Sequence, residues 1–306
     1  MCIRDRDGRA LSDLKQGVTL EIFGEGTSPG PFWKDKKFTS FGQAMQNLEN
    51  NGVALNVASF LGAATTRILE VGYDNRPATD GEIERMRGHV KNAMEEGAMG
   101  IGSSLIYAPG DYASTEELIE LCKVASNYGG MYISHMRNED SKVMSALEEL
   151  IRISKEADIP AEIYHLKSSR KPNWSKIDDI IKRVEEVRGQ GLKITADIYT
   201  YNASSTGLTG VIPTWVQEGG HRAWIERMKD PNIRPRLLED IRKELSEQPP
   251  EGILMVGFKT SEMSKKYLSK TVAEAAKMRG QSPEEAIVDM VIAVSYTHLR
   301  AHETLR

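Results

Sequence analysis

Cysteine, long apolar runs and excess charge are all scarce in this chain of 306 residues, and each absence excludes a class of protein. Only Cys2 and Cys122 are present, which excludes a disulfide framework, and the helical pattern around Cys122 predicts a core thiol. No apolar run approaches the roughly 20 residues that span a bilayer. The formal charge is −4, so no basic surface points to nucleic acid. We therefore expect a globular protein with neither a membrane nor a nucleic acid as partner.

A Gly-x-Gly-x-x-Gly motif is also missing after the early apolar runs, which argues against a dinucleotide-binding doubly wound sheet. Instead, short β-rich runs alternate with amphipathic helical runs. Strands are predicted at residues 18–23, 53–60, 98–103, 131–134, 161–164, 193–198 and 252–257, and helices at 79–96, 114–128, 140–157 and 175–189. Alternation of this kind indicates parallel βαβ units. The number and even spacing of the strands favour an α/β fold of the (β/α)8 TIM-barrel type.

Two histidines close apolar runs at equivalent places in this alternation. His135 and His165 lie thirty residues apart, which is one strand–helix–strand step. In a parallel barrel the carboxyl ends of the strands converge on one face, where the active site lies. A single such histidine is usually a hydrogen-bonded, half-buried residue, but the paired placement predicts two metal ligands. His89, in mid-helix, is expected to be solvated, and His221 to be a helix-cap or lid residue.

Charged residues near the strand ends add to this candidate site. Glu25 stands between Gly24 and Gly26 at the end of a predicted strand, where it is either a metal ligand or a turn residue that faces water. Arg137 and Lys167 each follow a candidate ligand by two residues, so strand alternation predicts that they point the same way as the histidines. We expect them to bind a substrate that carries a carboxylate and a polarised carbonyl.

The last predicted strand of the alternating region carries an acid and two tyrosines. Asp197 is either an acceptor that orients a ligand histidine from behind or a structural carboxylate at the strand end. Tyr199 and Tyr201 either donate a hydrogen bond to an oxyanion in the substrate site or pack as ordinary aromatic residues.

Four ordered motifs together resemble a known family. They are GAMGIGSSLIYAPG at 97–110, HMRNE at 135–139, HLK at 165–167 and DIYTY at 197–201. From about residue 8 to residue 293 the chain resembles the D-aminoacylase (N-acyl-D-amino-acid deacylase) family of the amidohydrolase superfamily. The resemblance implies a metal-dependent barrel that cleaves the amide bond of N-acyl-D-amino acids with one or two zinc ions. It also implies that His135 and His165 bind metal and that Lys167 helps to bind the substrate, a small N-acyl amino acid.

The chain departs from that family in three places. Nothing matches the His-x-His pair of the family's first strand, and the chain ends before the Ser-Asp motif whose aspartate is the general base. No residue of this chain is therefore assigned as catalytic base. Many members carry a metal-binding cysteine between glycines where this chain has Glu25, and a carboxylate oxygen can also bind zinc.

Both ends of the chain resemble translated sequencing-adaptor strings. We expect residues 1–7 and 294–306 to be artefacts, and residues 8–293 to be an incomplete barrel with an insertion around 207–250. His298 and His302 are accordingly not interpreted as a metal motif. On this interpretation the chain is a fragment that is inactive as given. The alternatives are a dihydroorotase-like cyclic amidohydrolase and a non-catalytic barrel protein. Oligomeric state stays open, as does the compartment, with the cytoplasm slightly favoured.

Overall fold

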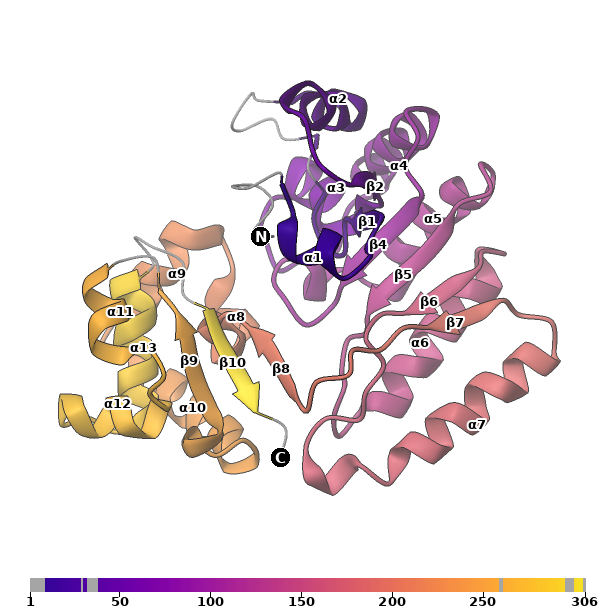
Figure 1. Ribbon diagram of the computed structural model, residues 1–306. Helices are drawn as coiled ribbons and strands as arrows, with labels where there is room; N and C mark the ends of the chain where they lie inside the picture. Colours follow the sequence, from indigo (N-terminus) through magenta and orange to yellow (C-terminus); the bar gives the residue numbers. More distant parts are fainter. Residues whose placement is uncertain (1–8, 29, 32–37, 259–260, 295–299, 305–306) are drawn as a thin grey trace. The chain divides into compact units, whose positions relative to one another are not determined.

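The computed structural model describes residues 9–28, 30–31, 38–258 and 261–294, together with the backbone of 300–304 (Figure 1). The chain divides into two compact units. The first holds the residues up to Gly72 with Arg76–Lys167 and Lys176–Ile198, and the second holds Tyr73–Asn75, Ser168–Ser175 and the residues from Tyr199 on. The predicted artefact at 1–7 lies outside the described residues. Residues 295–299 and 305–306 of the predicted artefact at 294–306 also lie outside them.

Parallel strands in chain order form the centre of the first unit. They are β1 (Leu20–Phe23), β2 (Asn56–Ser59), β3 (Leu61–Gly62), β4 (Gly100–Ser104), β5 (Met131–His135), β6 (Ala161–Ile163) and β7 (Ile194–Ala196). β1 pairs with β2, and the other five form a sheet in the order β3-β4-β5-β6-β7. Only Phe60 separates β2 from β3, and the Met99 amide donates to the Ser59 carbonyl at 3.0 Å. The predicted α/β class with parallel strands is confirmed.

Helices alternate with these strands in the first unit, as predicted. They are α1 (Leu11–Lys15), α2 (Phe41–Asn51), α3 (Ala63–Glu70), α4 (Asp80–Glu95), η2 (Gly110–Tyr112), α5 (Thr115–Ser126), α6 (Val143–Glu156) and α7 (Lys176–Gly189). α4 begins with a capping box between Thr79 and Glu82. The side chain that caps α5 is Ser114, which accepts from the Glu117 amide. This cap satisfies an amide that the helix itself leaves without a partner.

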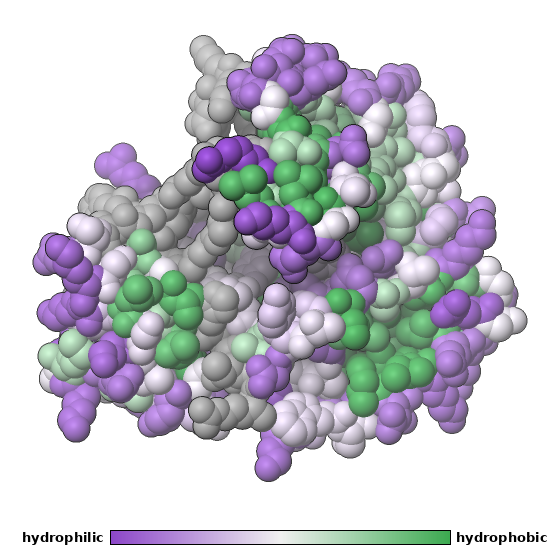
Figure 2. All heavy atoms as spheres, in the orientation of Figure 1, coloured by the Kyte–Doolittle hydropathy of each residue, from purple (hydrophilic) through white to green (hydrophobic). Residues whose placement is uncertain are grey.

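The core of the first unit lies between these helices and the sheet. Its fully buried members come from both layers, such as Met86 in α4, Leu118 in α5, Leu147 in α6 and Tyr132 in β5. Cys122 belongs to the same core, as predicted, and burial raises the pKa of its thiol. Figure 2 shows hydrophilic side chains covering α2, while hydrophobic side chains reach the surface near α1 and β1. The interior is therefore apolar and continuous beneath a mixed surface.

The second unit has a different architecture and its own core. Its elements are η3 (Lys171–Asn173), β8 (Ala203–Thr206), η4 (Leu208–Val211), α8 (Thr214–Gln217), α9 (Gly220–Lys229), α10 (Arg234–Glu247), η5 (Pro250–Gly252), β9 (Ile253–Gly257), α11 (Ser261–Tyr267), α12 (Val272–Arg279), α13 (Pro283–Val294) and β10 (Arg300–Thr304). The sheet is antiparallel in the order β8-β10-β9. The segment around 207–250, predicted as an insertion, forms mainly helices of this unit. None of the described helices is both long enough and apolar enough to cross a membrane.

One histidine differs from its predicted environment. The solvated position predicted for His89 in α4 is wrong, because its side chain is only 17% exposed and its Nε2 lies 2.6 Å from Glu70 Oε1. The sequence pattern missed this pair because Glu70 belongs to a different helix, α3. His221 is exposed at the start of α9, where the capping position itself is Gly219.

Candidate metal centre

Close contacts between backbone segments position Glu25. Gly24 has a φ of +93°, and a Cβ atom there would lie 2.1 Å from the carbonyl oxygen of Phe60. A Cβ atom on Gly102 of β4 would lie 2.0 Å from the Gly24 carbonyl oxygen. Only glycine permits these approaches. They bring the loop after β1 against β4, where Ser104 Oγ donates to Glu25 Oε1 at 3.1 Å.

The two histidines come from neighbouring strands, as predicted. His135 is the last residue of β5 and is buried, with 6% of its surface exposed. His165 follows the end of β6 by two residues, and its φ of +40° places it in the left-handed region that non-glycine residues rarely adopt. A carboxylate oxygen of Asp197 accepts from the His165 backbone amide, and the Leu166 amide donates to the Asp197 carbonyl at 2.8 Å. Asp197 thus fixes the backbone that presents His165, rather than its ring.

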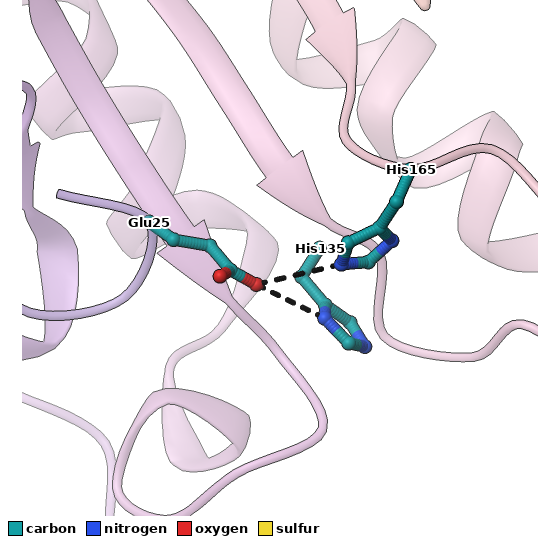
Figure 3. Close-up of side chains that lie close together, drawn as sticks. All are labelled: Glu25, His135 and His165. Atoms are coloured by element: carbon teal, nitrogen blue, oxygen red, sulfur yellow. Dashed lines mark hydrogen bonds and ion pairs between the residues drawn. The ribbon is translucent and has the colours of Figure 1, made fainter. Parts of the chain in front are cut away.

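Glu25, His135 and His165 point toward one another (Figure 3). Glu25 Oε1 lies 3.0 Å from His135 Nδ1 and 3.6 Å from His165 Nε2. The two imidazole rings have centroids 4.4 Å apart and are nearly perpendicular, at 85°. One ligand atom from each of the three residues lies within 4.8 Å of the others. Sequence reasoning predicted that the two histidines meet at the strand ends and left Glu25 as either a ligand or a turn residue, and the structure brings all three together.

A second carboxylate completes the cluster from the other side, and sequence reasoning missed it. Glu139 Oε1 lies 3.0 Å from His165 Nδ1, and Glu139 Oε2 lies 3.6 Å from His135 Nε2. Lys167 Nζ lies 2.7 Å from Glu139 Oε1 and 2.7 Å from His165 Nδ1. The available signal was that Glu139 closes the HMRNE motif four residues after His135.

The charges of the cluster shift the proton affinities of its members. Burial by itself raises the pKa of Glu25, but hydrogen bonds and positive charge from His135 and His165 hold that pKa well below its usual range. The pKa of Glu139 is lowered in the same way against burial, by His165, His135 and Lys167. Burial disfavours the charged form of His165, yet Glu139 and Glu25 together raise its pKa to about 9. Both carboxylates are therefore ionised and ready to attract a cation.

The donor set suits a metal ion such as zinc. Two imidazoles and a carboxylate are ligand types that zinc takes in proteins. Within the described part of the chain, His135 Nε2 is buried and makes no hydrogen bond, although buried polar atoms nearly always have a partner. The ring is therefore held by its ion-pair contacts with Glu25 and Glu139. A cation between Glu25 and the two rings would instead meet His135 Nδ1 and His165 Nε2, the nitrogens that face Glu25.

The residues predicted to bind substrate are placed differently from one another. Arg137 does not join the cluster, because its guanidinium group binds Glu149 at 2.8 and 2.9 Å and the carbonyl groups of Asp111 and Ala113 at 2.8 and 2.9 Å. It anchors the loop after β5 to α6. Lys167 does lie in the cluster, with a side chain that is 13% exposed.

The two tyrosines belong to the second unit. Tyr201 is 77% exposed, and its ring centroid lies 6.5 Å from that of Tyr199. Their predicted contact with substrate stays a prediction.

Comparison with curated proteins finds three close matches, whereas no family model matches the chain. The chain is 34% identical to a D-aminoacylase of Alcaligenes xylosoxydans over 198 residues, which are 65% of this chain and 39% of that protein. It is 30% identical to an N-acyl-D-glutamate deacylase of the same organism over 159 residues, 52% of this chain and 33% of that protein. The resemblance predicted from the motifs is confirmed. The matched part spans well under half the length of either relative.

Solved structures show the same fold. A D-aminoacylase described as defining a novel subset of amidohydrolases superposes with a TM-score of 0.75 at 24% identity, over 98% of this chain and 57% of that one. An N-acyl-D-glutamate deacylase of Bordetella bronchiseptica, solved with zinc and a phosphonate that mimics the tetrahedral intermediate, gives a TM-score of 0.75 at 21% identity. That match covers 99% of this chain and 58% of the other.

Proposed function

We propose that this chain, which is similar to D-aminoacylases and N-acyl-D-amino-acid deacylases, is the metal-binding part of a hydrolase that cleaves the amide bond of N-acyl-D-amino acids. The observation that carries the proposal is the cluster of Glu25, His135 and His165 at the carboxyl ends of parallel strands. Active sites of (β/α)8 barrels lie at this face. The match to a D-aminoacylase structure over 98% of this chain supports the finer assignment of the first unit to such a barrel.

Three side chains would hold the metal in this proposal. Glu25 Oε1, His135 Nδ1 and His165 Nε2 face one another and would be the ligand atoms. Zinc fits this set, and a structural neighbour was solved with zinc. Bound there, zinc supplies Lewis acidity that polarises the scissile amide carbonyl. One or two ions are compatible with the proposal, and the general base is not assigned to any residue of this chain.

The other residues predicted from the sequence would position a metal ligand or bind the substrate. Asp197 holds the backbone of His165, so it keeps the ligand at the mouth of the strands. Lys167 and Arg137 are the cations predicted to meet the carboxylate or carbonyl group of the N-acyl amino acid, and Tyr199 and Tyr201 are the hydroxyl groups predicted to donate to an oxyanion. Of the two cations, Arg137 is the weaker candidate because it lies outside the cluster and its donors bind Glu149 and two carbonyl groups.

Zinc titration of the chain and of its Glu25→Gln variant tests the metal centre. Because this substitution removes the only carboxylate among the proposed ligands, we expect the Kd for zinc to rise at least about tenfold, measured by competition with a chromophoric chelator. Glu84→Gln is the matched control, since the Glu84 side chain is 74% exposed. Equal zinc affinity in the Glu25 variant and the unaltered chain would reduce Glu25 to a turn residue.

The activity assay belongs to the complete gene product, because the matched part covers 39% of the D-aminoacylase relative. We expect release of D-amino acids from N-acetyl-D-amino acids, and no ring opening of cyclic amides. Turnover of the cyclic amides alone would favour a dihydroorotase-like enzyme. Stoichiometric zinc with neither activity would favour a non-catalytic protein.

A further inference from the structure

We infer that Glu139, held in place by Lys167, is a positioning residue that fixes which nitrogen of each histidine faces the metal. The inference rests on the proposed metal centre and adds to it a support on the side opposite Glu25. The observation behind it is that both imidazole rings lie between two carboxylates. Each histidine has one ring nitrogen toward Glu25 and the other toward Glu139.

The placement of the two carboxylates on opposite sides of the rings determines the tautomer of both histidines. His135 turns Nδ1 toward Glu25 and Nε2 toward Glu139, whereas His165 turns Nε2 toward Glu25 and Nδ1 toward Glu139. A neutral imidazole that gives one nitrogen to a metal must carry its proton on the other nitrogen. A carboxylate at that second nitrogen accepts the proton's hydrogen bond and stabilises this tautomer. Glu139 Oε1 occupies that position for His165, 3.0 Å from Nδ1, and Glu139 Oε2 faces His135 Nε2 as an ion-pair partner at 3.6 Å.

Lys167 makes the two sides of the cluster chemically different. Its ammonium group lies 2.7 Å from Glu139 Oε1, and both side chains are mostly buried, at 13% and 15% exposed. An ammonium group at that place repels a second cation, so a metal ion is directed to the Glu25 side. Lys167 also compensates the charge of Glu139, which would otherwise be costly to bury.

The contact between Lys167 Nζ and His165 Nδ1 admits two proton arrangements. Either Nδ1 and Lys167 both donate to Glu139, or Nδ1 lacks a proton and accepts from Lys167. In the second arrangement His165 Nε2 carries the proton toward Glu25 and cannot bind a metal. Glu139 therefore selects the arrangement that leaves Nε2 open to the metal.

The loop after β5 is built to hold Glu139 in this position. Asn138 Oδ1 accepts from the backbone amides of Asp140 at 3.0 Å and Lys142 at 2.8 Å, which fixes the turn around Glu139. Arg137, two residues before Glu139, binds Glu149 of α6. Since both neighbours of Glu139 are fixed, the carboxylate is preorganised against the rings and needs no adjustment when metal binds.

Zinc affinity of the Glu139→Gln variant is the first test. The amide cannot compensate the Lys167 ammonium group, so we expect the Kd for zinc to rise about 10- to 100-fold, as is usual when a partner behind a metal ligand is lost. Changing Lys167→Met in the same variant removes the uncompensated charge and should recover part of that loss. Glu84→Gln serves again as the matched control, and far-UV circular dichroism checks that each variant is folded.

Unchanged zinc affinity in folded Glu139→Gln overturns the positioning role but leaves the metal centre intact. A chain that binds no zinc even when unaltered overturns the metal centre, and this inference with it. The two failures are therefore distinguishable.

The tautomers themselves provide a second test that needs no variant. With zinc bound to the unaltered chain, NMR of isotope-labelled histidine nitrogens should show the proton of His165 on Nδ1 and that of His135 on Nε2. The opposite assignment for either ring overturns the inference.

Discussion

Arg67 and Glu117 form an ion pair that is almost completely withdrawn from solvent in the first unit. Arg67 Nη1 lies 2.5 Å from Glu117 Oε2, and their side chains are 1% and 4% exposed. Arg67 also donates to the carbonyl group of Arg76. Because the two charges depend on each other, removal of one leaves the other buried without its counter-ion.

Glu117→Leu should therefore lower the free energy of unfolding by about 3–5 kcal/mol. The double variant Glu117→Leu with Arg67→Met should lower the free energy of unfolding clearly less, because it buries no unpaired charge. Urea unfolding followed by circular dichroism measures both. If the double variant is the less stable of the two, packing rather than charge determines the contribution of this pair.

Glu82 provides a pH-dependent contribution to stability. It accepts from Arg76 at 2.7 Å and from the Thr79 amide at 2.7 Å, and these hydrogen bonds hold the pKa of its carboxyl group below the ordinary value of 4.5. A carboxyl group with a lowered pKa in the folded chain stabilises it above the unfolded-state pKa. That contribution is lost as the pH falls below this value.

Glu82→Gln should cost about 1 kcal/mol near neutral pH, the usual contribution of a helix cap. The difference from the unaltered chain should shrink progressively below pH of about 5. Thermal unfolding at a series of pH values measures it, with the exposed Glu84→Gln as control. A difference that stays constant in acid would assign the effect to helix propensity instead.

At the scale of elements, the turn that directly follows β1 depends on Gly24. Gly24→Ala adds a Cβ atom 2.1 Å from the Phe60 carbonyl oxygen at a φ of +93°. We expect a loss of about 3–5 kcal/mol from strain and overpacking together, and weaker zinc binding because Glu25 moves.

Gly17→Ala is the matched control for this prediction. Gly17 also has a positive φ, +82°, but nothing lies within 4 Å of an added Cβ atom. We expect Gly17→Ala to lower the free energy of unfolding by about 1–2 kcal/mol, from backbone strain alone, and to leave zinc binding unchanged. Equal losses in the two variants would show that the contact with Phe60 relaxes freely.

The strands of the first unit were predictable because buried parallel strands read as short apolar runs between glycines and helices. Runs such as β5 and β6 met this pattern within one residue. β3 did not, since it has two residues and is separated from β2 by Phe60 alone. β8 did not either, because its sequence ASST shows no alternation of apolar and polar residues.

The site was predictable to the extent that strands carry it. His135 ends β5, so its position followed from the strand itself. The alternation of side chains along a strand predicted that Arg137 lies on the same side as His135. This prediction fails because the strand stops at His135 and the chain turns toward α6. Glu139 returns to the rings through that turn, which is a tertiary arrangement without periodicity in the sequence.

At the scale of the whole molecule, the described residues form two hydrophobic cores. One core is built from the first unit, between α4, α5, α6 and the parallel strands. The other is built from the second unit, with fully buried residues such as Ile241 in α10. All members of the metal cluster belong to the first unit.

Ile241→Ala should therefore destabilise the second unit by about 2–5 kcal/mol while zinc binding stays unchanged. Leu147→Ala, an equally buried position in α6, should cost a similar amount and weaken zinc binding through the first unit. Unfolding curves recorded together with zinc titrations distinguish the two. A loss of zinc binding in the Ile241 variant would show that the cluster needs both cores.

Around Glu25, the course of the backbone and the donor atom offered to a metal are determined by different residues, so the two can evolve independently. Gly24 and Gly102 fix where the loop runs, through backbone atoms alone. The side chain at position 25 determines only which donor atom it offers. A lineage can therefore exchange oxygen for sulfur at this position by a single substitution, which changes the softness of the site and the metals it prefers without disturbing the scaffold. Such a position can vary in its donor while Gly24 and Gly102 stay constant.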